Sequence, residues 1–157
     1  MRTPTKHQGR GGVAAVELAV ILPVLVLFIV GVWEVGRMVE VQQLLTNAAR
    51  EGGRQASIGN VDTQGVKDAV KRYLKQNGLT TVTDSDITVT NLTDGSRADP
   101  TQANQLDRFE VVVTIPFSSV RWAVLNQVTT TKNLVGSADW FSMRDIPITV
   151  NNDPPLN

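Results

Sequence analysis

An unbroken apolar run of 21 residues, from Val13 to Trp33, constrains this chain more than any other feature of its sequence. The middle of the run reads LAVILPVLVLFIVGVW, and Glu17 is the only ionisable residue within it. An α-helix needs about 20 predominantly apolar residues to cross the hydrocarbon core of a bilayer. The run therefore predicts a single membrane-spanning helix, in which Pro23 predicts a bend.

The charges on either side of the run predict the orientation of this helix. Arg2, Lys6 and Arg10 precede it with no acidic residue among them, whereas the segment after it carries both signs. An excess of Lys and Arg beside a membrane span stays in the cytoplasm. We therefore expect residues 1–12 to form a basic cytoplasmic leader, residues 13–33 to span the membrane and the rest of the chain to lie outside the cytoplasm.

A cleaved secretory signal peptide would also combine a basic start with an apolar run. Its apolar region has about 7–15 residues and ends at a small-residue site of the A-x-A type. The run in this chain is longer, no such site follows it, and a helical pattern continues directly into charged residues. The sequence therefore favours a helix that is retained in the mature protein.

The segment at residues 34–56 predicts that the helix continues outside the membrane. Its apolar residues recur at spacings of three and four, which is typical of an amphipathic helix; they are Val35, Met38, Val39 or Val41, Leu45, Ala48 and Ala49. The other positions are largely occupied by Glu34, Arg37, Glu40, Gln43, Asn47 and Arg50. Gly52 and Gly53 predict the end of the helix, which would then run from Val13 to about Gly52.

The remaining residues, 57–150, predict a small α+β domain on the outer side of the membrane. A second helix is expected within VDTQGVKDAVKRYLKQNG, ending at Gly78, with one apolar face made by Val66, Ala69, Val70, Tyr73 and Leu74. Three strands are expected within SDITVTNL, RFEVVVTIPF and TTTKNLVGSADWFSM. Two helices and three antiparallel strands give an α+β fold, with the first helix as its backbone.

Three segments of this domain predict irregular structure. The polar stretch TDGSRADPTQANQLD, between the first two strands, is expected to be a mobile loop. Residues 118–127 are compatible with either a short helix or a packed loop. The tail at residues 151–157, NNDPPLN, is expected to be disordered.

The composition excludes several kinds of chemistry. The chain has no cysteine and one histidine, His7, which precedes the apolar run, so the domain cannot build a Ser-His-Asp triad or a histidine metal cluster. The fragment at Asp84–Asp86 lacks further acidic ligands at a useful spacing and is interpreted as a solvated turn. The net charge of zero predicts no nucleic-acid surface. We therefore predict no catalytic residue, no metal site and no cofactor, and expect the protein not to be an enzyme.

Two further groups of residues are interpreted as structural. The basic stretch KDAVKRYLK is expected to be a solvated helix face. Trp122 and Trp140 are expected to pack in the core or on the sheet rather than to bind a ligand.

The first third of the chain resembles the N-terminal region of TadE-like proteins, the pseudopilins of the tight-adherence (Flp) pilus system. That region combines a basic leader ending in glycine, a V-E-aromatic step, a proline in the apolar run, an E-x-G-R turn and an N-A-A-R-E-G segment. The matching residues here are Arg10, Gly12, Val16, Glu17, Leu18 (in place of the aromatic residue), Pro23, Glu34, Gly36, Arg37, Asn47, Arg50, Glu51 and Gly52.

The resemblance implies a pilin-like fold and processing by a prepilin peptidase. In that family the cut follows a glycine and leaves glutamate as the fifth residue of the mature chain. Cutting between Gly12 and Val13 makes Glu17 the fifth residue, whereas cutting after Gly11 would make it the sixth. We therefore predict cleavage between Gly12 and Val13, with Glu17 as the residue that aligns subunits during assembly.

The resemblance also implies partners and a location. The partners would be the prepilin peptidase, other pilin or pseudopilin subunits and the inner-membrane proteins that assemble the pilus. The protein would lie in the cytoplasmic membrane, with its C-terminal domain outside and with possible incorporation into a surface pilus. Its sizeable outer domain favours a minor subunit over a major pilin, and the alternative is an uncleaved, signal-anchored envelope protein with an external binding or scaffold domain.

Overall fold

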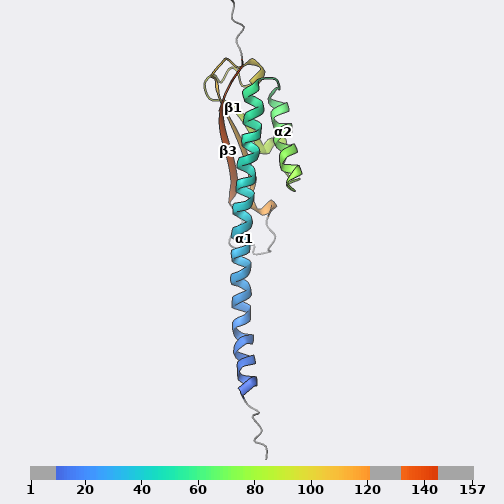
Figure 1. The fold of residues 1–157 in the computed structure, drawn as a ribbon, viewed down its shortest axis with the longest axis vertical. Coiled ribbons are helices and arrows are strands. Elements are labelled where there is room, and N and C mark those ends of the chain that lie inside the picture. The colour runs from blue at the N-terminus through green and yellow to red at the C-terminus, as the bar shows by residue number, and fades with distance from the viewer. Residues whose placement is uncertain (1–9, 121–131, 145–157) are drawn as a thin grey trace, which may run out of the picture.

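The computed structural model describes residues 10–120 and 132–144. It consists of one long helix, α1 (Arg10–Ile58), with a small domain packed against its C-terminal half (Figure 1). The domain adds helix α2 (Thr63–Gln76) and the strands β1 (Ile87–Asn91), β2 (Arg108–Pro116) and β3 (Asn133–Phe141). The α+β fold predicted from the sequence is therefore confirmed, with all three predicted strands and both predicted helices present.

Helix α1 is longer than predicted at both ends. It begins at Arg10 rather than Val13, continues through Pro23 and ends at Ile58 rather than near Gly52. The residue that terminates it is Gly59, whose φ of +68° lies in the left-handed region that glycine adopts readily. The backbone N–H of Gly59 donates a hydrogen bond to the carbonyl of Ala56 over 3.2 Å.

Gly52 and Gly53 lie inside the helix, so the prediction that they end it is wrong. Both are buried because other elements press against them. A Cβ atom at Gly52 would lie 2.5 Å from Cγ2 of Val70 in α2, and one at Gly53 would overlap with the indole ring of Trp140 in β3. These glycines are therefore contact points between α1 and the rest of the domain, and their lack of a side chain serves packing.

Helix α2 follows its sequence signals closely. Asp62 caps its N-terminus by accepting a hydrogen bond from the Gly65 N–H over 2.8 Å. Gly78, with φ of +85°, follows the last residue of α2, Gln76, by two positions and prevents the helix from continuing. Its buried face is made by Val66, Ala69, Val70 and Leu74, with Tyr73 half-buried beside them.

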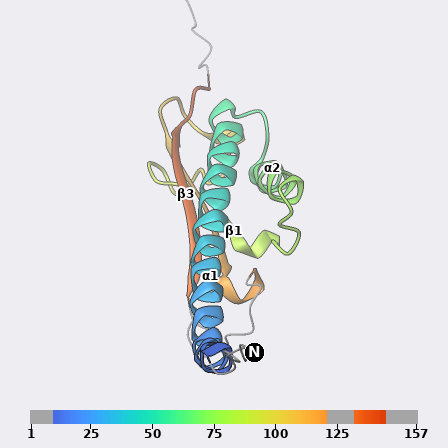
Figure 2. The ribbon, with the colours of Figure 1, turned by 60° about the horizontal axis from the view of Figure 1, so that its bottom comes forward.

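The three strands form an antiparallel sheet in the order β1-β2-β3. In the centre of the sheet Val89 pairs with Val111, which pairs with Ala138. Alternate residues of β2 are buried, as expected for a sheet with one face on the core and one face in solvent. Figure 2 shows α2 and β3 on different sides of α1.

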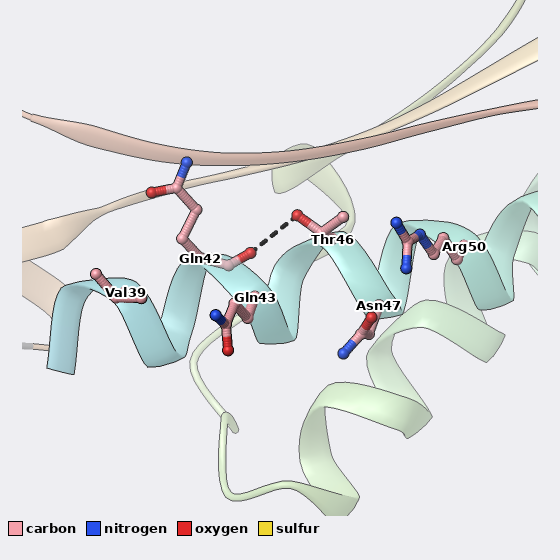
Figure 3. A pocket seen from close by; sticks show the side chains of 6 residues that line it. All are labelled: Val39, Gln42, Gln43, Thr46, Asn47 and Arg50. Carbon is pink, nitrogen blue, oxygen red and sulfur yellow. Dashed lines mark hydrogen bonds between the residues drawn. The ribbon is translucent and has the colours of Figure 1, made fainter. Parts of the chain in front are cut away.

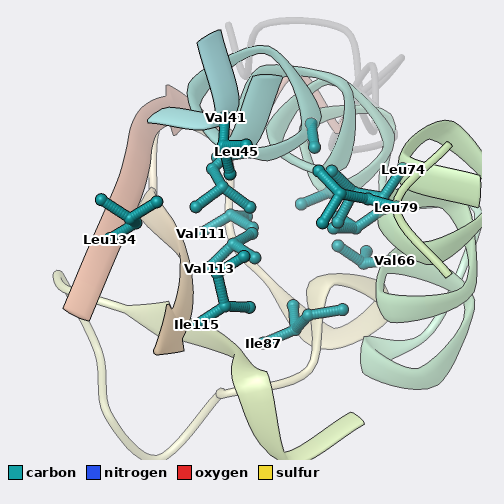
Figure 4. Close-up of a cluster of buried hydrophobic side chains, with 14 of the residues drawn as sticks. Val41, Leu45, Val66, Leu74, Leu79, Ile87, Val111, Val113, Ile115 and Leu134 are labelled. Carbon is teal, nitrogen blue, oxygen red and sulfur yellow. The ribbon is translucent and has the colours of Figure 1, made fainter. Parts of the chain in front are cut away.

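The core lies between α1, α2 and the inner face of the sheet (Figure 4). All five regular elements contribute large buried side chains to it, among them Val41, Leu45, Val66, Leu74, Ile87, Val111, Val113 and Leu134. A Cβ atom at Gly136 would overlap with the main chain at Leu45 and Thr46, which shows that strand β3 lies directly on the backbone of α1.

The two contacts between β3 and α1 keep the same spacing along both elements. From Gly136 to Trp140 the strand advances about 13 Å, at about 3.3 Å per residue. From Leu45 to Gly53 the helix advances about 12 Å, at 1.5 Å per residue. Strand β3 therefore runs alongside α1 in the same direction, and both contacts can form at once.

The loop between β1 and β2 contains more fixed structure than its polar composition predicts. Asp107, which is buried, accepts hydrogen bonds from the side chain of Asn91 over 3.1 Å and from the backbone N–H of Asn104 over 2.9 Å. A short 3₁₀ turn at Pro100–Gln102 buries the proline. These contacts tie both ends of the loop to the sheet, against the prediction of a mobile loop.

Several predictions fall outside the described residues. They are those for the leader charges Arg2 and Lys6, for Trp122 and most of residues 118–127, and for the tail at 151–157. At the end of the first described range, just before residue 121, Phe117–Ser119 forms a short 3₁₀ helix and Phe117 is buried. Trp140 packs against α1, as predicted.

Candidate functional site

The candidate processing site lies in the first turns of α1. Gly12, Val13 and Glu17 all lie on this helix and are exposed, and a Cβ atom at Gly12 would meet nothing within 4 Å. Five residues of helix place Glu17 about 7.5 Å along the axis from Gly12. The carboxylate of Glu17 makes no hydrogen bond or ion pair with any described residue. Both the bond predicted to be cut and the glutamate are therefore open to another molecule.

The segment that follows is apolar and is left exposed by the described part of the chain, as in a candidate membrane span. No residue between Gly12 and Trp33 is buried, and the large apolar side chains along it, apart from the half-buried Val30, are about half to three-quarters exposed. Its 21 residues span about 32 Å as a helix, close to the thickness of the hydrocarbon core of about 30 Å. Within the part of the chain that the structure describes, α1 is the one helix long and apolar enough to cross a membrane.

Burial in the domain begins where the apolar run ends. Glu34 is 7% exposed, and its Oε1 atom is buried without a hydrogen-bond partner among the described residues. The periodicity of the sequence assigns Glu34 to the polar face of the helix. This assignment is wrong, because the structure buries Glu34. Arg37, one turn further on, pairs with Glu40 over 3.0 Å.

The residues of the N-A-A-R-E-G segment divide into two groups. Ala48, Ala49 and Gly52 face the core and are buried. Asn47 and Arg50 are exposed on the opposite side of α1 and make no side-chain hydrogen bond or ion pair with a described residue. The first group is explained by the packing of the domain, whereas the second has no role within the described chain.

Glu51 belongs to neither group, and its carboxylate links successive turns near the C-terminal end of α1. It accepts hydrogen bonds from Arg54 over 2.7 Å and 2.9 Å and from Gln55 over 3.0 Å. The bond from Arg54 is the main reason that the pKa of the Glu51 carboxyl lies below its ordinary value. The pair is solvent-accessible, so it stabilises the helix only modestly.

The acidic fragment before β1 is a structural turn, as predicted. Asp84 begins a short 3₁₀ helix and pairs with Lys71 of α2 over 2.5 Å. It also accepts a hydrogen bond from Gln64 over 3.0 Å. The basic face of α2 is therefore only partly solvated, since Lys71 fastens α2 to the turn that leads into the sheet. No group of three or more His, Asp or Glu side chains that could hold a metal ion occurs among the described residues.

Sequence reasoning missed the contacts that glycine makes possible. Gly53 against Trp140 and Gly136 against Leu45 fix β3 along α1, although the residues of each pair are about 90 positions apart in the sequence. One signal was present: two adjacent glycines within an otherwise regular helical pattern indicate either a helix end or a close approach. The sequence alone could not choose between them.

The fold and the N-terminal segment define a class of protein: a membrane-anchored α+β protein whose long N-terminal helix is also the spine of its α+β domain. The model of the family described as "TadE-like protein" matches residues 12–54. This match confirms the resemblance to the TadE-like family along α1, from the glycine before Val13 to the contact with Trp140. Comparisons with curated proteins and with solved structures found no match.

Proposed function

We propose that this protein is a minor, pilin-like subunit of a tight-adherence (Flp-type) pilus or a related secretion assembly. The observation that carries the proposal is the TadE-like match, which begins at Gly12 and runs almost to the end of α1. The exposure of Gly12, Val13 and Glu17 supports it, because the first turns of α1 are not covered by any other described element and are accessible to a peptidase or a neighbouring subunit. The outer domain, in this proposal, selects neighbours and catalyses nothing.

Assembly begins with insertion as a prepilin. The leader charges Arg2, Lys6 and Arg10 keep the N-terminus in the cytoplasm, and α1 spans the membrane with the α+β domain outside. A prepilin peptidase then cuts between Gly12 and Val13, which removes the leader charges and creates a positively charged amine at Val13. Glu17, one turn further along α1, becomes an acceptor for the corresponding amine of a neighbouring subunit.

The energetic reason for this pairing is the membrane. An ionised carboxylate in the apolar region is costly, by about 2.5–3.5 kcal/mol at the centre of a helix and less near the interface. Pairing Glu17 with an amine on an adjacent helix offsets that cost only when the two helices have the correct axial alignment. Glu17 therefore favours association with other pilin-like subunits and with the inner-membrane proteins that assemble them.

The proposal is tested by co-purification from membranes that contain the complete pilus machinery. We expect Glu17→Gln to insert normally but to recover at least about tenfold less of the other pilus components, which corresponds to a loss of about 1.4 kcal/mol. Glu40→Gln is the matched control, because Glu40 is an exposed glutamate of the same helix outside the apolar run. Equal recovery with both variants would refute the role of Glu17, and no recovery with the unaltered chain would favour the uncleaved envelope anchor.

A further inference from the structure

Helix α1 includes the peptide bond that is predicted to be cut. It begins at Arg10, so Gly12 and Val13 lie within its first turns. In an α-helix each carbonyl group accepts a hydrogen bond from the N–H four residues further on, which for Gly12 is the N–H of Val16. Gly12 is exposed, but the helix still engages its carbonyl group. A peptidase that reaches this turn therefore meets a bond whose carbonyl is closed off by the backbone.

The first turn of α1 has the composition of a turn that opens easily. Residues 10–13 read RGGV, and glycine disfavours a helix more than any residue except proline. Residues 13–30 contain no glycine. The first turn also has no acidic residue, which would stabilise it through the helix dipole. We therefore expect the helix to open more readily at the turn that contains the cut than in the apolar run.

The apolar run does not depend on this turn. If residues 10–13 open, the helix begins at Ala14 and still has 20 residues up to Trp33, which is enough to cross the hydrocarbon core. The freed carbonyl groups of residues 10–12 lie on the leader side of the run, where water can bond to them. Further opening would free backbone groups within the hydrocarbon core, where each is costly. The opening is therefore confined to the turn that contains the cut.

We propose that Gly11 sets the rate of processing, because it lets the first turn of α1 open and present the Gly12–Val13 bond to the peptidase in an extended form. This inference rests on the proposed function and adds a positioning residue to it. Gly12 is the residue at the cut, whereas Gly11 acts through the backbone of the turn. Figure 1 shows this turn at the end of α1 farthest from the α+β domain, so its opening leaves the domain untouched.

The hydrolysis that follows the opening consumes one water molecule. The water oxygen bonds to the carbonyl carbon of Gly12 and the C–N bond to Val13 breaks. Both water protons end on the Val13 nitrogen, so the products are a carboxylate at Gly12 and an ammonium group at Val13. Opening precedes this step, because the carbonyl must first be released from the N–H of Val16.

Substitutions at Gly11 separate helix opening from a simple steric effect. When a segment opens and closes faster than it is cut, the rate of proteolysis follows the fraction of open chains. Gly11→Ala favours the helix and should slow the cut about fivefold, which corresponds to about 1 kcal/mol. Gly11→Val should slow it only about twofold, because β-branched valine favours a helix less than alanine does. A peptidase that excludes side chains at this position would give the reverse order, since valine is larger.

The test uses the full-length chain in detergent with a limiting amount of prepilin peptidase, and it measures the initial rate of leader loss. Gly36→Ala is the matched control. It is the same substitution in the same helix, far from the cut, and its methyl group meets nothing within 4 Å. This control should be cut at the rate of the unaltered chain. The final extent of processing should stay near normal at Gly11, because a slower cut still reaches completion.

Hydrogen exchange measures the opening without the peptidase. The N–H of Val16 should exchange about fivefold more slowly in Gly11→Ala than in the unaltered chain, and at the same rate in Gly36→Ala. Equal rates of cutting for Gly11→Ala and the unaltered chain would overturn the proposal. So would a slower cut in Gly11→Val than in Gly11→Ala, or exchange at Val16 that Gly11→Ala does not change.

These outcomes are separable from those of the proposed function. If the unaltered chain is cut after Gly12 but the Gly11 variants are cut at the same rate, processing stands and only the role of Gly11 is wrong. If the unaltered chain is not cut at all, the proposed processing fails, and the role of Gly11 fails with it.

The strongest other candidate is the shallow groove of about 410 Å³ along the exposed side of α1, between Val39 and Arg50 (Figure 3). The Thr46 hydroxyl at its edge is engaged with the carbonyl of Gln42 over 3.0 Å. Nothing among the described residues shows what covers this groove, so we assign it no partner.

Discussion

The indole ring of Trp140, in β3, lies against the backbone of Gly53, close to the C-terminal end of α1. The glycine pair predicts a helix end at this point. Instead the helix continues past the contact, and α1 has 49 residues. The apolar N-terminal half of α1 and the α+β domain are joined by this one continuous helix, because the sheet is built on the same helix. The orientation of the domain therefore follows that of α1.

Gly53→Ala should destabilise the α+β domain, because the added methyl group overlaps with the Trp140 ring. Overpacking of this kind costs about 1–3 kcal/mol. In a domain of this size that lowers the melting temperature by roughly 5–15 °C, which circular dichroism of the detergent-solubilised chain would measure. Gly36→Ala is the matched control, because its methyl group meets nothing and alanine favours the helix. An equal effect at the two positions would contradict the packing role of Gly53.

The α+β domain should fold without the apolar N-terminal half of α1. No residue between Gly12 and Trp33 is buried, whereas Val41, Leu45, Ala48 and Ala49 supply the helix side of the core. A soluble fragment comprising residues 34–157 is therefore expected to show mixed helix and strand signals and one cooperative unfolding transition in urea. A fragment that unfolds without a cooperative transition would show that the domain depends on the apolar run.

Acid should weaken this domain in a defined direction. Hydrogen bonds from Arg54 lower the pKa of the Glu51 carboxyl, and those from Lys71 lower the pKa of the Asp84 carboxyl. A group with a lowered pKa in the folded state stabilises it above the pKa of the unfolded chain, and this contribution is lost as the pH falls through the folded value. Stability should thus be constant above about pH 5 and fall below it.

The charge-neutral variant Glu51→Gln provides the comparison for this pH series. It should be less stable than the unaltered chain near pH 7 and should lose less stability between pH 5 and pH 3, when both are measured by urea unfolding. Parallel profiles for the two chains would mean that Glu51 contributes nothing to the acid sensitivity.

The sequence predicted the elements of this fold better than their contacts. Periodicity located α1, α2 and the three strands because each element buries one face, which leaves a local pattern in the chain. The pairing of Gly136 with Leu45 leaves no such pattern, since it joins segments far apart in the sequence. The burial of Glu34 was missed because an acidic residue at the end of an apolar run is expected to face water.

The candidate site was predictable to a similar extent. The spacing of Gly12 and Glu17 and the motif residues of α1 identified the helix that the family match covers. A role for the exposed Asn47 and Arg50 could not be predicted, because polar residues on an amphipathic helix look the same whether they face water or another subunit. Only the structure distinguishes Gly36, which has open space, from Gly52 and Gly53, which have neighbours.

The extent of cleavage by a prepilin peptidase should depend on one of two adjacent glycines. Gly12→Leu should block processing, because it changes the residue before the cut. Gly11→Leu should be processed at nearly the normal extent. Immunoblots of membranes from cells that contain the peptidase would separate the two variants by the mass of the leader. Loss of processing in Gly11→Leu alone would place the cut after Gly11.

The most direct test of the central claim is the intact mass of the unaltered protein extracted from membranes of cells that carry the pilus system. A pilin-like subunit should have lost its first 12 residues and should begin at Val13, so that Glu17 is the fifth residue. A chain that still begins at Met1 would contradict the account and identify an uncleaved membrane anchor.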